Sequence, residues 1–267
     1  KSMFWTTFAA DSVNSFDLFA KGLSNEGNII NTMTYEKRVG WGAAYPPLYS
    51  LALSYALSLG FETSKIIPTL FFISLPIGFY CLTLKVTNPT NAIFFTFLAI
   101  VSPELIAQSA INITNVPQST YAALGVISFL VWYNTKEKRY LYLSCILLAF
   151  NAFVRSEGII YIGSISFIYL IISFKKREYK NLVLFTFLAG FPFLLWQFFM
   201  KYYSEVMSKF QQVIIITHPN LDYDQFKGIF DLSMETIQSQ QYYGITFKAF
   251  FLILLINLYY IIKKKDN

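Results

Sequence analysis

The stretch VPQSTYAALGVISFLVWYNTKEKRYLYLSCILLAFNAFV, residues 116–154, decides the fold class. Two apolar segments, 116–133 and 140–154, flank a short loop, 135–139, that carries two lysines and an arginine. A helix needs about 17–25 mainly apolar residues to cross the ~30 Å hydrocarbon core of a bilayer. Short basic loops are typical of the cytoplasmic side of membrane proteins. The pattern therefore predicts two membrane-spanning helices that are joined on the cytoplasmic side.

The composition of the whole chain agrees with this interpretation. The 267 residues are 55% hydrophobic and 13% charged, whereas soluble domains are about 45–50% apolar and about 25% charged. We therefore expect an all-α fold, a polytopic transmembrane helical bundle. The predicted spans cover residues 66–85, 90–103, 116–133, 140–154, 158–174, 182–200 and 244–262.

The basic loops set the predicted topology. We assign three basic segments to the cytoplasm: loops 135–139 and 175–181 and the C-terminal tail. Counting spans from these segments gives the side of every other loop. We expect an integral, multi-pass protein of the inner or plasma membrane. Because the chain begins at Lys1 rather than at a methionine, we also expect a helix upstream. The predicted parts are a first external loop, a core of about six spans, a second external loop, and a last span with its tail, at residues 1–65, 66–200, 201–243 and 244–267.

The net charge of +6 does not indicate nucleic-acid binding. The excess lies in the short loops between apolar segments, which favours membrane lipid as the partner. Both cysteines, Cys81 and Cys145, fall inside apolar segments, where a thiol behaves as a small hydrophobic group. The sequence predicts neither a disulfide nor a metal site.

The segment GWGAAYPPLYSLALSYALSLGF, residues 40–61, looks like a further span but is too short. From Leu48 to Leu59 it provides ~18 Å of helix, less than a ~30 Å core requires. Pro47 suits a first helical turn, where its missing N–H costs nothing. Polar residues interrupt the segment, so we expect an amphipathic helix on the outer leaflet with a wetter side formed by Tyr49, Ser50, Ser54, Tyr55 and Ser58.

The stretch FAADSVNSFDLFAKGLSNEG, residues 8–27, predicts a second helix outside the bundle. Its apolar residues recur at helical spacing over 12–23, and Gly27 is a suitable stop. Asp11 lies at or just before the helix N-terminus. There a carboxylate can cap free N–H groups, or it can act in catalysis.

Four motifs in this order resemble the GT-C class of membrane glycosyltransferases. They are Asp11 with its helix, the YPPL sequence at 45–48, Ser102-Pro103 with TNVPQSTYAAL at 114–124, and FVRSEG at 153–158. The likeness is to the branch of protein O-mannosyltransferases and aminoarabinose transferases. It implies a GT-C type bundle that transfers a sugar, with inversion, from a polyprenyl-phosphate donor to a hydroxyl of a glycan, lipid or protein acceptor. The reaction would occur on the non-cytoplasmic side without a metal or other cofactor.

The resemblance also assigns acidic residues. Asp11 matches the first-loop acid that acts at the acceptor as general base. Relatives often carry a second acid beside it, where this chain has Ser12, and another at the position of Asn115, which is an amide. Glu104 can supply the missing acid, or it is a solvated loop carboxylate.

Cations are needed for the leaving phosphate, and several positions qualify. Lys65 matches a site where relatives carry arginine, but it also fits a lysine reaching from a helix end to the interface. Lys201 has the same two interpretations. We expect Arg155 mainly to form an ion pair with Glu157 at the outer interface, with a phosphate contact as the alternative. Tyr45 either lines a sugar site or belongs to the interfacial aromatic belt.

Three other functions remain open. An O-antigen-type polymerase or ligase would depend on external arginines, and this chain offers only Arg38 and Arg155. A lipid or saccharide transporter would show repeat symmetry and ionisable residues near the midplane, neither of which is visible. A purely structural membrane protein is the third.

Overall fold

The computed structural model describes residues 16–30, 32, 45–61, 66–109, 111–176 and 179–202, with single positions between 227 and 253. Within this part every regular element is an α-helix and no strand occurs, which confirms the all-α prediction. The elements are α1 Asp17–Glu26, α3 Leu48–Ser58, α4 Ile66–Thr83, α5 Pro89–Ile100, α6 Pro103–Gln108, α7 Asn115–Thr135, α8 Lys138–Val154, α9 Gly158–Lys176 and α10 Tyr179–Tyr202.

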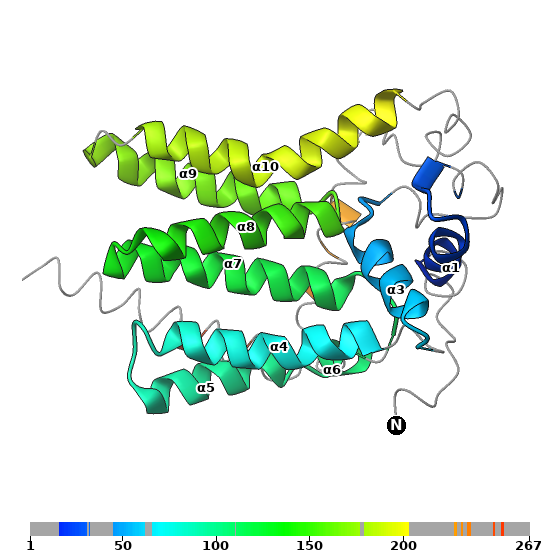
Figure 1. Cartoon of the computed structure of the whole chain (residues 1–267). Coiled ribbons are helices and arrows are strands. Elements are labelled where there is room, and N and C mark those ends of the chain that lie inside the picture. The colour runs from blue at the N-terminus through cyan, green and yellow to red at the C-terminus, as the bar shows by residue number, and fades with distance from the viewer. Residues whose placement is uncertain are drawn as a thin grey trace, which may run out of the picture.

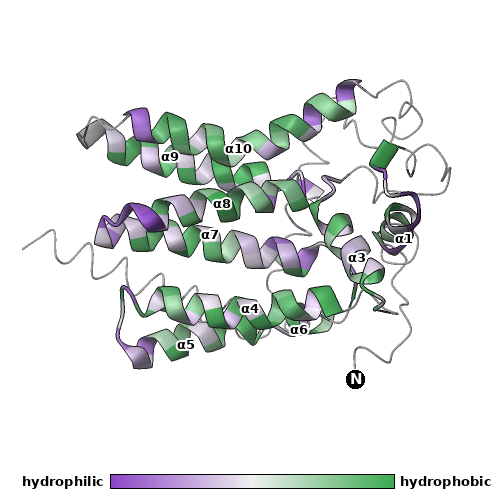
Figure 2. Cartoon of the chain, in the orientation of Figure 1, coloured by the Kyte–Doolittle hydropathy of each residue, from purple (hydrophilic) through white to green (hydrophobic). Residues whose placement is uncertain are grey.

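The long helices lie side by side and alternate in direction, so that their connections gather at two ends (Figure 1). We call one of these the basic end; it contains Lys85, Lys136, Lys138 and Arg139, and its hydrophilic colouring is visible in Figure 2. The opposite end, where α1 and α3 lie, is the cap end. The predicted topology had placed the basic loops on one side and the first loop on the other, and the chain path agrees with it.

The predicted helical segments from 66 to 200 are confirmed as helices, with one break. Within the predicted segment 90–103, α5 ends at Ile100 and a short helix, α6, starts at Pro103. Proline is favoured at the first position of a helix because no partner is lost there. Most of the segment 244–262 and most of the second external loop lie outside the described residues.

The bundle core is an aromatic cluster between α7, α8, α9 and α10. Tyr169 packs against Trp132 and Phe185 with ring centroids 4.8 and 6.0 Å away, and Phe129 lies 5.1 Å from Trp132. Tyr169 and Phe129 are almost fully buried. Burial of such side chains stabilises the fold by roughly 1.5–3 kcal/mol each.

Two helices, α4 and α10, are long and apolar enough to cross a membrane by length and composition. Only 22% of their most apolar window is buried inside the protein. Many apolar side chains of α10, and Leu70, Ile73 and Ile77 of α4, are exposed on the outside of the bundle, unlike those of a core helix in a soluble protein.

The apolar stripe of α1 packs against two sets of neighbours, one on α10 and one on α3. Phe19 and Leu23 pack against Trp196 of α10. Phe16 and Ala20 pack with residues of α3, among them Tyr49. The predicted stop is confirmed, since Gly27 has a φ of 63° and its N–H donates to the carbonyl of Leu23. The helical stripe was predicted from residue 12, but residues 1–15 lie outside the described part.

The predicted wetter side of α3 is correct for Tyr55 and Ser58, which are exposed, and wrong for Tyr49, Ser50 and Ser54, which are buried. Ser50 and Ser54 are buried against the protein, whereas Leu51, Tyr55 and Leu59 are exposed at spacings of four. The serine hydroxyls can face inward because the helix itself satisfies them: that of Ser54 donates to the carbonyl of Leu51 at 2.9 Å. The side of α3 that faces away from the protein is therefore more apolar than predicted.

Gly22 allows a close approach inside the cap end, and Gly22→Ala is expected to lower the free energy of unfolding by about 1–2 kcal/mol. A Cβ there would lie 2.5 Å from Cγ2 of Thr32. Thr32 is fully buried and its hydroxyl donates to the carbonyl of Asn28, so it cannot move aside at low cost. Gly190→Ala is the control, because that Cβ would meet no atom of the described residues within 4 Å. Thermal unfolding in detergent tests the pair, and equal midpoints would contradict the expectation.

Candidate functional site

The turn between α8 and α9 positions the central side chain of the site, Arg155. Arg155 ends α8 in an extended conformation, with its N–H donating to the carbonyl of Asn151 at 3.1 Å. The turn closes when the N–H of Gly158 donates to the Arg155 carbonyl at 2.9 Å. A Cβ on Gly158 would lie 2.5 Å from backbone atoms of Ala152. The sharpness of this turn therefore depends on glycine at 158.

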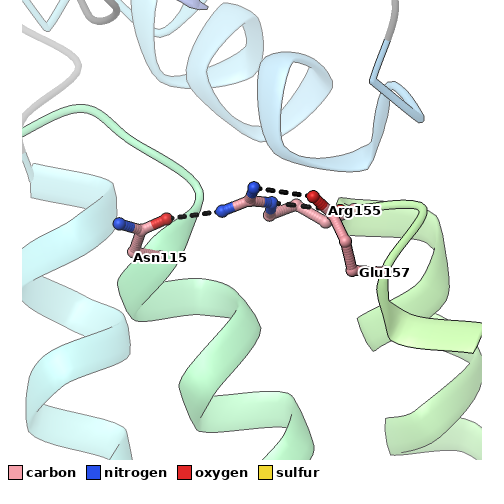
Figure 3. A network of polar contacts seen from close by, with 3 residues as sticks. All are labelled: Asn115, Arg155 and Glu157. Atoms are coloured by element: carbon pink, nitrogen blue, oxygen red, sulfur yellow. Dashed lines mark hydrogen bonds and ion pairs between the residues drawn. The ribbon is translucent and has the colours of Figure 1, made fainter. Parts of the chain in front are cut away.

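The guanidinium of Arg155 contacts three side chains, two of which are drawn in Figure 3. Nη2 and Nε donate to the two carboxylate oxygens of Glu157 at 2.8 and 3.3 Å. Nη1 donates to Oδ1 of Asn115, in the first turn of α7, at 2.7 Å. The third contact is the ring of Tyr45, whose centroid lies 5.2 Å from Cζ, within the range of a cation–π interaction. We call Tyr45, Asn115, Arg155 and Glu157 the Arg155 cluster.

The electrostatics of this cluster leave it able to bind an anion. The predicted ion pair is confirmed, and it balances the charge of Arg155 without burying it, because 23% of the arginine side chain stays accessible. A guanidinium has five N–H donors, and the contacts among the described residues use three. The two donors that remain, one on each terminal nitrogen, can donate to a phosphate or carboxylate.

A second polar group at the cap end joins α1 to the loop before α7. Nδ2 of Asn112, which is buried, donates to Oδ1 of Asp17 at 2.7 Å. Tyr49 lies beside them, with its ring centroid 5.8 Å from that of Phe16. Burial, and secondarily the charge of Asp17, raise the pKa of Tyr49 well above its usual value. Tyr49 therefore stays protonated at neutral pH.

Sequence reasoning missed this group. Asp17 follows an apolar residue of the helical stripe, and its partner lies 95 positions away. No local pattern signals such a contact. The available signal was an acid in the first turn of an otherwise apolar helix, where a carboxylate is stabilised by the positive helix end.

The other predicted site residues are not part of the Arg155 cluster. Glu104 is not a loop residue, as one prediction had it, but belongs to the first turn of α6, where it accepts a hydrogen bond from Gln108. Lys201 is exposed in the last turn of α10. No hydrogen bond or ion pair among the described residues joins either of them to Arg155. Asp11 and Lys65 lie outside the described residues.

A metal centre finds no support in the described ranges. No group of three His, Cys, Asp or Glu side chains there lies close enough together to hold an ion. Three carboxylates at the cap end contact a different polar partner each: Asn112 for Asp17, Gln108 for Glu104 and Arg155 for Glu157.

Comparison with known proteins gives no relative. No protein-family model, curated protein or solved structure matches the chain. Its function is therefore inferred from its own residues and their geometry.

Proposed function

We propose that this protein is an integral membrane glycosyltransferase of the GT-C type, which moves a sugar from a polyprenyl-phosphate donor to a hydroxyl acceptor on the non-cytoplasmic side. One observation carries the proposal. Tyr45, Asn115 and Arg155, each from a different motif of the GT-C resemblance, meet in one cluster. The cluster lies at the end of the bundle opposite the basic loops.

The membrane placement is supported by where the apolar surface lies. The most apolar windows of α4 and α10 are mostly on the outside of the bundle. A soluble protein rarely exposes a contiguous apolar patch above a few hundred Å². Loops rich in Lys and Arg favour the cytoplasmic side, so the basic end is assigned to the cytoplasm and the Arg155 cluster to the opposite leaflet.

The proposed reaction needs one base and one anion-binding group. The acceptor oxygen attacks the anomeric carbon of the sugar as the bond from that carbon to the phosphate oxygen breaks. The acceptor proton passes to the carboxylate of Asp11, and the polyprenyl phosphate leaves with the bonding electron pair. Asp11 lies five residues before Phe16, so the chain between them spans at most ~18 Å when fully extended. The ring centroid of Phe16 lies 5.7 Å from that of Tyr45, which belongs to the Arg155 cluster.

Arg155 is proposed to bind the donor phosphate. Its two remaining N–H donors supply charge-assisted hydrogen bonds, which are stronger than neutral ones. Glu157 and Asn115 hold the guanidinium in place, and the Tyr45 ring supports one face of it. A donor arriving from the bilayer meets the exposed stripe of Leu51, Tyr55 and Leu59 on α3, which is apolar enough to contact a prenyl chain.

Replacing Arg155 tests this role. Arg155→Gln is expected to reduce kcat/KM for sugar transfer about 10²- to 10⁴-fold, mostly through the KM for the donor, because two charge-assisted hydrogen bonds are lost. The assay supplies radiolabelled polyprenyl-phosphate sugars to membranes that contain the protein. Thermal unfolding of the same variant shows how much of the loss is structural.

Arg139→Gln is the matched control. Arg139 also pairs with a carboxylate two residues away, Glu137, at 2.5 Å, but at the basic end. It should leave the KM unchanged. An equal loss in both variants, or no change in Arg155→Gln, would contradict a phosphate-binding role.

A further inference from the structure

A cavity of about 450 Å³ opens at the basic end of the bundle, between α7, α8, α9 and α10. It lies at the opposite end from the Arg155 cluster and takes no part in the proposed transfer. Its lining combines two lysines with an amide and apolar side chains, among them Lys136, Lys138, Asn181, Leu184 and Leu188. A cavity that is charged on one side and apolar on the other fits an amphiphile better than a small soluble anion.

The charged side of the cavity is fixed in place. The ammonium of Lys136 donates to the carbonyl of Tyr133 and lies 4.0 Å from the centroid of the Tyr133 ring and 5.9 Å from that of Trp132. These contacts hold the ammonium of Lys136 beside the cavity.

The second lysine adds to the positive potential. Lys138 is exposed and begins α8, whose first turn contains no acidic residue and whose N-cap provides no side-chain hydrogen bond. The start of a helix carries a partial positive charge. The neighbouring Glu137 is engaged by Arg139 at 2.5 Å, so its charge is already balanced.

The apolar side of the cavity continues along the outside of α10. Leu184 and Leu188 line the cavity, and Phe191, Leu195 and Phe198 follow at spacings of three or four, all of them exposed. Residues at these spacings share one helix face. The face runs for ~21 Å from the cavity toward the cap end, a length that suits an acyl chain.

We propose that the cavity binds an anionic phospholipid. Its phosphate head group lies against Lys136 and Lys138, and one acyl chain follows the exposed face of α10. This inference rests on the membrane placement proposed above, though not on the sugar transfer. Net charge selects the lipid, because each lysine attracts a negative head group but gains little from a zwitterionic one.

Binding of two lipids with identical acyl chains tests the proposal. The full chain in detergent is titrated with phosphatidylglycerol or phosphatidylcholine, and native mass spectrometry counts the bound lipids. The first lipid bound by wild type is expected to show about a 25-fold preference for phosphatidylglycerol, roughly fivefold for each lysine.

Three variants locate the site. Lys138→Gln should lower the preference about fivefold, and Lys136→Gln with Lys138→Gln should abolish it. Leu184→Trp, at an exposed position of the lining, should weaken binding of both lipids by filling the cavity. Lys85→Gln is the matched control, because Lys85 is exposed at the same end but does not line the cavity.

Three other results would overturn the proposal, and each contradicts a different part of it. Equal binding of the two lipids by wild type would remove the anionic site while leaving the membrane placement intact. A loss in Lys85→Gln as large as in Lys138→Gln would show that the overall charge of the basic end, rather than the cavity, selects the lipid. Failure of both lipids to bind would contradict the membrane placement as well, whereas the sugar-transfer assay remains a separate test.

Discussion

Gly158→Ala is expected to lower the free energy of unfolding by about 3 kcal/mol, at the upper end of what overpacking usually costs. The new Cβ would overlap Oδ1 of Asn151 and lie 2.5 Å from the Ala152 backbone nitrogen and Cα. Backbone inside α8 cannot move aside without breaking helical hydrogen bonds. Asn151 is also fixed, since it is fully buried and its Nδ2 donates to the carbonyl of Gln118 at 2.9 Å.

The measurement is the midpoint of thermal unfolding in detergent, with a fall of roughly 6 to 12 °C expected for a chain of this size. Gly163→Ala is the matched control, because it lies in the same helix and its Cβ would meet nothing within 4 Å. Alanine there should be neutral or slightly stabilising. Equal unfolding midpoints for the two variants would show that the turn between α8 and α9 does not require glycine at position 158.

Asp11→Asn is expected to reduce sugar transfer at least 100-fold, because an amide cannot take the acceptor proton and general-base catalysis typically contributes 10²- to 10⁴-fold. The KM for the donor should change little, since Asp11 is proposed to act on the acceptor. Initial rates with radiolabelled donor at saturating concentration measure the effect. Thermal unfolding should be unaffected, because asparagine caps a helix N-terminus about as well as aspartate does.

Asp17→Asn is the control for this carboxylate. Asp17 lies in the same segment and accepts a hydrogen bond from Asn112, and an asparagine there keeps an oxygen that can accept it. Transfer should stay within a few-fold of wild type. If Asp17→Asn abolishes transfer and Asp11→Asn does not, the base has been assigned to the wrong end of the segment.

The bundle helices could be predicted from sequence because their signal is local. Long apolar segments separated by basic or glycine-containing turns predicted a helix over 158–174, and the structure has α9 at Gly158–Lys176. The ion pair of Arg155 with Glu157 was predictable for the same reason, since both residues lie in one short turn between helices. The placement of Asn115 beside Arg155, 40 positions away, was implied only through the motif resemblance.

What the sequence did not indicate depends on contacts between distant segments. Ser50 and Ser54 of α3 were predicted to face water but are buried, because hydropathy ranks a hydroxyl as polar whether or not its own helix satisfies it. The bond between Asp17 and Asn112 leaves no periodic trace. The cavity at the basic end forms only when four helices pack together. Periodicity predicts which segments are helical, but not which of their faces meet.

The central claim is that a membrane glycosyltransferase faces away from the cytoplasm, and sealed membrane vesicles test it most directly. Right-side-out vesicles containing the full chain would be loaded with radiolabelled polyprenyl-phosphate sugars and given an acceptor that cannot cross the bilayer. We predict transfer of label to that acceptor in right-side-out vesicles and none in sealed inverted ones, with the activity lost in Asp11→Asn. Absence of transfer from every donor in both orientations, or equal transfer by wild type and Asp11→Asn, would contradict the account.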